Sequence, residues 1–171
     1  YPENTNKLVN DNLIKLFYSF IIISFSFSIE SKDIYDKSWA LIIGIDKYES
    51  VSKLNYAVND AESMQDILLN TFEFPSENIT LLTNEQATKQ NILKSLSNIT
   101  MNANENDRVV IFFAGHGETM DLPEGGEMGY LLPVDGDSEN LYLSSIDMDE
   151  LEKISLISKA KHILYLVDAC Y

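Results

Sequence analysis

The sequence predicts an α/β fold: an open, mainly parallel sheet with helices on both faces. Two observations support this prediction, namely short apolar runs typical of strands buried on both faces, and helix-like segments between them. The runs are WALIIGI (39–45), NITLLT (78–83), RVVIFFAG (108–115) and HILYLVDA (162–169). Strands and helices that alternate in this order are expected to be joined by right-handed crossovers.

Three segments between the predicted strands have the apolar spacing of amphipathic helices. The apolar positions, three or four residues apart, are Ala61, Met64, Leu68 and Phe72 in the first segment, Ile92, Leu96 and Ile99 in the second, and Met148, Leu151 and Ile154 in the third. Asn59, followed three residues later by Glu62, is the expected N-cap of the first helix. Thr88 precedes the second helix, and Asp147 with Glu150 forms a possible capping pair at the third.

One long connection interrupts this alternation. About 30 residues separate Gly115 from the helix near Asp147, far more than the usual loop of 2 to 6 residues. The segments 130–132 and 141–143 could pair there as a small hairpin outside the main sheet. A loop of this length is usually functional or carries strands of its own.

Composition restricts the classes of function. Of the 171 residues, 45% are hydrophobic, which suits one compact domain and is too apolar for a disordered chain. Twelve Lys and Arg against 27 Asp and Glu give a net charge of -15, which argues against nucleic acid as a partner. The single cysteine, Cys170, excludes an internal disulfide, and with only two histidines a Cys/His metal cluster is hard to assemble.

The N-terminal region has the layout of a signal peptide or N-terminal anchor. The run at 16–29 carries no charge, follows Lys15 and contains the small residues Ser26 and Ser28 near its end. We therefore expect the secretory pathway, with an extracellular or membrane-anchored product. The alternative is a buried N-terminal strand or helix in a cytoplasmic protein. In either case residues 1–35 are set aside, and 38–171 is the expected domain.

Two reactive side chains follow neighbouring apolar runs. His116 comes directly after the third run, and Cys170 directly after the fourth. Chemistry in open α/β sheets gathers at the carboxyl ends of the strands, and a histidine on the next strand can serve as the base that activates a thiol. Taken alone, the cysteine is more often a small buried apolar residue and the histidine often structural.

Six segments together resemble the caspase-like cysteine peptidases, most closely the metacaspases. They are ALIIGIDKY, LNYAVNDAESM, ITLLTN, VIFFAGHG, GYLLPVDGD and LVDACY, in the order found in that family. The resemblance implies a Cys170 nucleophile, a His116 base and an oxyanion hole formed by the backbone amides of Gly117 and Cys170. It also implies a sheet of six strands, of which the last two would follow Tyr171. We therefore expect a fragment of a longer protein.

The resemblance also bears on specificity. Metacaspases carry Asp two residues before the nucleophile and cleave after Arg or Lys, whereas caspases carry Gln there and cleave after Asp. This chain has Asp168 at that position, and Asp60 matches another acidic position that could share the pocket. A carboxylate in the pocket would pair with a guanidinium or ammonium group. The alternative is that Asp168 only caps or orients its own loop.

Two functions from different classes follow. The first is a cysteine endopeptidase that acts on proteins or peptides; the second is a catalytically inactive caspase-like interaction module or truncated pseudo-enzyme. We expect no cofactor for the peptidase. Calcium is suggested by the resemblance and by 11 acidic residues without Lys or Arg in 109–152, although such runs are usually a solvated face. An uncovered last strand could also pair with a second molecule.

Overall fold

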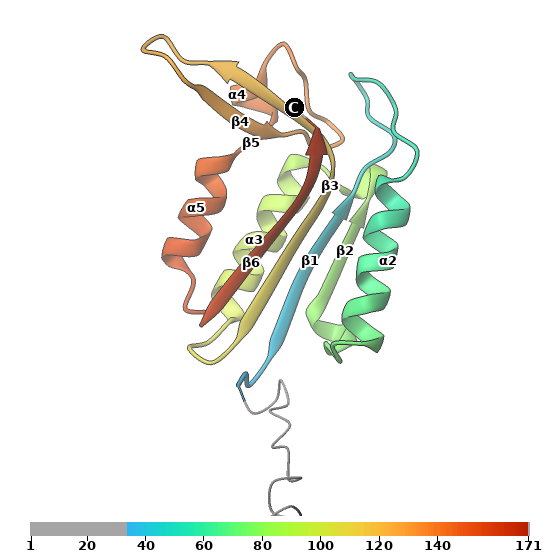
Figure 1. Cartoon of the computed structure of the whole chain (residues 1–171), viewed down its shortest axis with the longest axis vertical. Helices are drawn as coiled ribbons and strands as arrows, with labels where there is room; N and C mark the ends of the chain where they lie inside the picture. Colours follow the sequence, from blue (N-terminus) through green and yellow to red (C-terminus); the bar gives the residue numbers. More distant parts are fainter. Residues whose placement is uncertain (1–33, 171) are drawn as a thin grey trace, which may run out of the picture. The chain divides into compact units, whose positions relative to one another are not determined.

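The computed structural model describes residues 34–170, in which a parallel sheet forms the centre (Figure 1). Its strand order is β2-β1-β3-β6. The strands are β1 (Ser38–Gly44), β2 (Ile79–Thr83), β3 (Arg108–Asp121) and β6 (His162–Cys170). The predicted α/β class and all four predicted strands are confirmed. The charge-free run at 16–29 lies outside the described residues.

Helices cover both faces of this sheet. Helix α2 (Ala57–Asn70) packs on one face, where Ala61 and Leu68 meet apolar side chains of β1 and β3. Helices α3 (Lys89–Asn102) and α5 (Met148–Ile157) lie against the other face, through Leu96 and Leu151 among others. None of the helices in the described part of the chain is long and apolar enough to cross a membrane.

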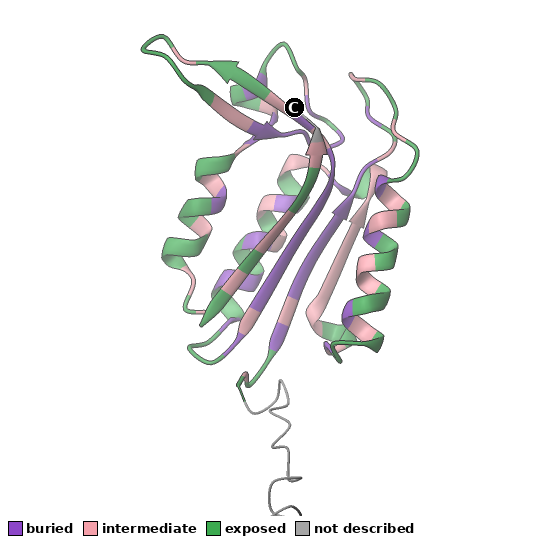
Figure 2. Cartoon of the chain, viewed as in Figure 1, coloured by how far each residue is buried: buried purple, intermediate pink, exposed green. Residues whose placement is uncertain are grey.

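Burial differs between the inner and outer strands of the parallel sheet (Figure 2). Strands β1 and β3 are buried over most of their length. Strand β2 is only half-buried, and on β6 the side chain of Leu164 is 51% exposed. The prediction that all four strands are buried on both faces is therefore wrong for β2 and β6, since each pairs with one neighbour on a single edge within the described parallel sheet.

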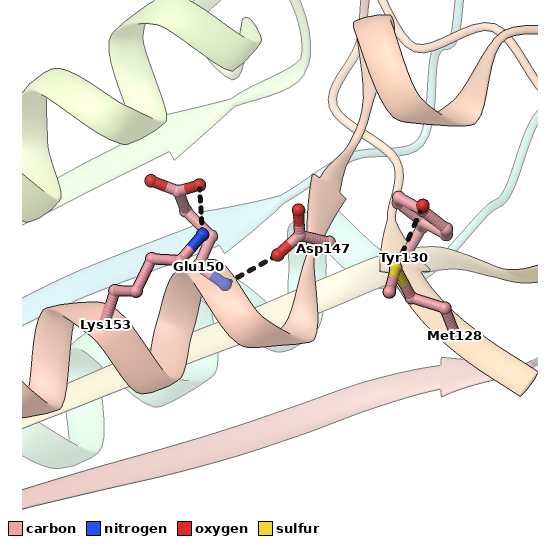
Figure 3. Close-up of polar contacts among 5 residues, drawn as sticks. All are labelled: Met128, Tyr130, Asp147, Glu150 and Lys153. Carbon is pink, nitrogen blue, oxygen red and sulfur yellow. Dashed lines mark hydrogen bonds and ion pairs between the residues drawn. The ribbon is translucent and has the colours of Figure 1, made fainter.

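Two of the predicted helix starts are confirmed. The Thr88 hydroxyl accepts a hydrogen bond from the Asn91 N–H at the start of α3. At α5, a carboxylate oxygen of Asp147 accepts from the Glu150 N–H at 2.7 Å, and Glu150 also pairs with Lys153 at 3.9 Å (Figure 3). Each of these caps lies within three residues of its partner, which makes it visible in sequence.

The predicted start of α2 is wrong. The helix begins at Ala57, two residues before Asn59, and the Ala57 N–H donates to the side chain of Asp46 at 2.9 Å. A carboxylate from the loop after β1 thus caps the helix in place of Asn59. Phe72 was expected on the apolar face of this helix, but it lies beyond the helix end and is 49% exposed.

The small hairpin predicted within the long connection after Gly115 forms between different segments. Strand β3 continues to Asp121 and pairs antiparallel with β4 (Glu127–Leu131), which in turn pairs with β5 (Ile146–Asp147). Gly125 and Gly126 provide positive φ values of 91° and 92° in the connecting turn, so a local hairpin forms. Residues Leu141–Ser144 form the short helix α4. Pairing of 130–132 with 141–143 is therefore wrong.

Two short 3-10 turns flank β2: η2 (Ser76–Asn78) and η3 (Asn84–Gln86).

On β4, the hydroxyl of the buried Tyr130 donates to the Met128 sulfur at 3.1 Å (Figure 3). Burial raises the pKa of Tyr130. The phenol therefore keeps its proton to a higher pH than an exposed tyrosine does, which suits its role as a donor within this small antiparallel layer.

Candidate active site

His116 and Cys170 occupy the same level of two adjacent parallel strands. In the register of β3 and β6, His116 is the Cα partner of Cys170, and Ala114 is the partner of Asp168. Neighbouring strands lie about 4.8 Å apart. The expected adjacency of the two runs is therefore observed. His116 does not end its strand, however, because β3 continues beyond it into the hairpin with β4.

The loop between β1 and α2 holds the imidazole of His116. The His116 backbone N–H donates to the Tyr48 hydroxyl oxygen at 2.8 Å, and the centroids of the two rings are 4.9 Å apart. Nε2 lies 2.9 Å from the backbone carbonyl oxygen of Ser52 and 3.4 Å from its hydroxyl. A carbonyl oxygen only accepts, so Nε2 carries the hydrogen and Nδ1 is the acceptor of the neutral ring.

Tyr48 is a buried support beneath this histidine. Its side chain is 7% exposed, and this burial raises its pKa to about 12, while the hydrogen bond from the His116 N–H lowers it and nearby Asp46 raises it. Gly115 makes room for the phenol, because a Cβ at that position would collide with the Tyr48 hydroxyl. Glycine at 115 therefore allows the close approach of Tyr48 to β3.

A pocket of about 320 Å³ opens beside His116. Its wall consists of residues 53–57 and of Asp60, Ala114, Gly115, His116 and Asp168. Asp60 lies in the first turn of α2 and is half-buried, whereas Asp168 is exposed on β6. Lys53 brings one positive charge to the same wall. The three predicted residues His116, Asp60 and Asp168 thus line one cavity.

The other predicted site groups are placed as follows. Gly117 lies on β3, opposite Leu131 of β4. Cys170 is placed through its backbone, as the last residue of β6. Within residues 34–170, no group of three or more His, Cys, Asp or Glu side chains is arranged to hold a metal ion. The calcium suggestion stays a prediction.

Sequence reasoning missed Tyr48 and Ser52. Tyr48 belongs to the ALIIGIDKY segment, whose β1 residues show only the pattern of a buried strand. Ser52 makes its closer contact with Nε2, at 2.9 Å, through its backbone carbonyl, which any residue type could supply, so the sequence gives little signal for it. Only the path of the loop brings these two groups to His116.

The sequence model of the caspase domain matches residues 37–171. The chain belongs to the caspase-domain family. This match confirms the resemblance to caspase-like cysteine peptidases.

The curated relatives of this caspase domain include several fungal metacaspases. Metacaspase-1 of Eremothecium gossypii is 29% identical over 144 residues, which cover 77% of this chain and 31% of the relative. Metacaspase-1A of Aspergillus oryzae is 35% identical over 106 residues, or 56% of this chain and 25% of the relative. Metacaspase-1 of Saccharomyces cerevisiae is 28% identical, with shares of 77% and 32%. The matched part thus spans about a third or less of these relatives' length.

A solved structure supports the fold of the caspase domain independently of close sequence similarity. Protein GSU0716 from Geobacter sulfurreducens superposes with a TM-score of 0.65 at 21% identity, over 78% of this chain and 50% of that chain. At this level of identity the likeness shows the fold alone.

Proposed function

We propose that this caspase domain belongs to a cysteine endopeptidase in which Cys170 is the nucleophile and His116 is its base. The single observation that carries the proposal is the register that pairs His116 with Cys170 on adjacent parallel strands. Membership of the family supports protein or peptide substrates. The acceptor Nδ1 that remains on His116 provides the base that a thiol needs.

The reaction follows from these roles. The Cys170 thiol gives its proton to Nδ1 of His116, and the resulting thiolate attacks the carbonyl carbon of the scissile peptide bond. The backbone amides of Gly117 and Cys170 are proposed to stabilise the oxyanion. His116 then returns the proton to the leaving amine, and a thioester forms between the substrate acyl group and Cys170. Water attacks the thioester, which releases the acid and regenerates the thiol.

The first experiment uses the fact that Cys170 is the single cysteine of the chain. Iodoacetamide modifies thiolates, so near neutral pH its reaction should be several-fold slower in His116→Ala than in the wild type. His162→Ala is the matched control, since His162 lies at the other end of β6 and contacts Tyr35. Equal alkylation rates in all three proteins would refute the role of His116. Peptidase activity that survives in Cys170→Ala would refute the nucleophile.

We further propose that the pocket beside His116 binds the Arg or Lys side chain that precedes the scissile bond. The carboxylates of Asp60 and Asp168 support this assignment, and together they outweigh the positive charge of Lys53 on the same wall. A charge-assisted hydrogen bond contributes roughly 1.5–3 kcal/mol, which corresponds to about a 10- to 150-fold preference.

Paired peptides test the pocket. Matched substrates with Arg or Asp before the scissile bond should differ by about two orders of magnitude in kcat/KM in the wild type. Asp168→Asn should remove most of that preference, and Lys53→Ala, which takes away the opposing charge, should increase it. A wild-type preference for Asp would show that Asp168 only orients its loop.

A further inference from the structure

The loop at 45–56 is the element that positions His116. Tyr48 binds the backbone of His116 and Ser52 binds its imidazole, so both contacts come from this one loop. The same loop also supplies Lys53 and its neighbours to the wall of the pocket. Whatever fixes the path of this loop therefore fixes both the orientation of the imidazole and the shape of the pocket.

Asn84 binds this loop from the end of β2. Its side-chain oxygen accepts two hydrogen bonds, from the backbone N–H groups of Asp46 and Lys47, each at 3.0 Å. Lys47 directly precedes Tyr48 in the chain. The backbone of Asn84 has a φ of 42°, in the left-handed region that few residues other than Gly and Asn adopt readily. Asn84 thus supplies an acceptor oxygen for two backbone N–H groups and also adopts a backbone conformation that few residue types favour.

Asp46 provides a second attachment of the loop. Its backbone carbonyl accepts from the Leu54 N–H at 2.9 Å, and its carboxylate caps Ala57 at the start of α2. Apart from the Glu49 N–H, which donates to the Val134 carbonyl oxygen at 3.1 Å, the loop is held at its first residues by Asn84 and closed on itself by Asp46. Tyr48 and Ser52 lie between these two attachments.

We propose that Asn84 is a positioning residue for His116. By accepting from two consecutive backbone N–H groups, it holds the loop so that the Ser52 carbonyl keeps the hydrogen on Nε2 and leaves Nδ1 as the acceptor. Its catalytic consequence rests on the proposed function, because only a peptidase that uses His116 as its base needs that proton arrangement. The positioning itself is a property of the loop and can be measured without substrate.

The test compares two substitutions at the same position. Asn84→Gly tolerates the left-handed φ but removes the oxygen, whereas Asn84→Asp keeps an acceptor oxygen of nearly the same shape. The readout is the tautomer of each imidazole, taken from its ¹⁵N chemical shifts above the titration range. The chain has only two histidines, so His162, which bonds to Tyr35, is an internal control.

The expected result is specific to one ring and one variant. In Asn84→Gly, the Nε2–H form of His116 should give way to a mixture of tautomers, while His162 and the Asn84→Asp protein stay as in the wild type. In Asn84→Gly, loss of the two hydrogen bonds that the Asn84 side chain accepts should also slow the alkylation of Cys170 by iodoacetamide by about three- to tenfold. If Asn84→Gly does not fold, Asn84→Ser, whose shorter side chain withdraws the oxygen from the loop, replaces it.

Three other outcomes would overturn the proposal. An unchanged His116 tautomer in Asn84→Gly, with only a lower melting temperature, would mean that Asn84 has a purely structural role. A loss of the Nε2–H form in both Asn84→Gly and Asn84→Asp would mean that the acceptor oxygen is not what matters. A mixture of His116 tautomers already present in the wild type would remove the premise. Alkylation that does not respond to His116→Ala would instead overturn the proposed function and leave the tautomer test intact.

Discussion

Replacing Tyr48 with Phe removes one hydroxyl and leaves the ring in place. In the wild type, that hydroxyl accepts the His116 N–H at 2.8 Å, and the phenol is buried. Without it, a partly buried N–H loses its partner, which costs about 1–2 kcal/mol, in the lower part of the usual range. Tyr48→Phe should therefore be less stable than the wild type by about that amount near neutral pH.

The same substitution predicts a pH dependence. The pKa of Tyr48 is raised from 10.0 to about 12, chiefly by burial. Between these values the unfolded chain releases the phenolic proton and the folded chain does not, so the stabilisation is complete below about pH 10 and is lost as the pH rises towards 12. At about pH 11 the wild type should have lost about 1.4 kcal/mol of stability through this group. Tyr48→Phe has no such group to lose.

Urea unfolding followed by the fluorescence of the single Trp39 measures both effects. The stability difference between wild type and Tyr48→Phe should shrink from about 1–2 kcal/mol near pH 8 to nearly zero near pH 11. Tyr56→Phe is the matched control, because Tyr56 is exposed at the end of the same loop. A difference that is the same at both pH values would refute the reasoning, as would a Tyr48→Phe protein more stable than the wild type near neutral pH.

Three further predictions concern the packing of α2 and the N-terminus. Gly44→Ala should destabilise the fold by about 1–3 kcal/mol in urea, because the new Cβ would lie 2.5 Å from the Ala57 carbonyl oxygen; an unchanged midpoint would show that α2 can move away. Asp46→Ala should cost about 1 kcal/mol through loss of the α2 cap, with Asp46→Asn recovering much of it, and equal losses in both variants would contradict the capping role. Residues 1–35 fused to a reporter should direct it into the secretory pathway, and a reporter that remains wholly cytosolic would exclude a signal peptide.

The features predicted correctly from sequence depend on neighbouring residues. The strands follow from continuous apolar runs, and the helix starts after Thr88 and at Asp147 are set by side-chain caps that act over three residues. The wrong predictions involve partners that are distant in the chain: Asp46 caps a helix eleven residues later, and β4 pairs with an extension of β3 that has no apolar run of its own. Spacing alone does not reveal such pairings, because loop paths decide them.

In the candidate site, too, some features could be predicted from sequence and others depend on the path of a loop. The juxtaposition of His116 and Cys170 could be predicted, because parallel strands end at one edge and each residue follows an apolar run. The tautomer of His116 could not, because it depends on a backbone carbonyl at Ser52 that carries no residue signature. The family resemblance is what predicts that Asp60 and Asp168 belong to the substrate pocket, and the structure shows both on the wall of one cavity.

All four parallel strands contribute to the geometry at this edge of the sheet, although the proposed chemistry needs residues from only two of them. Strands β3 and β6 carry His116 and Cys170. The ends of β1 and β2 carry Asp46 and Asn84, whose hydrogen bonds fix the loop that holds the imidazole. A lost thiol or imidazole would remove the proposed reaction outright, whereas a loosened loop would leave both groups present and misaligned. In the order β2-β1-β3-β6, the two strands that carry His116 and Cys170 thus lie next to each other, and the two strands that hold the loop lie on the other side of β3. Asn84 acts on His116 through the loop between β1 and α2.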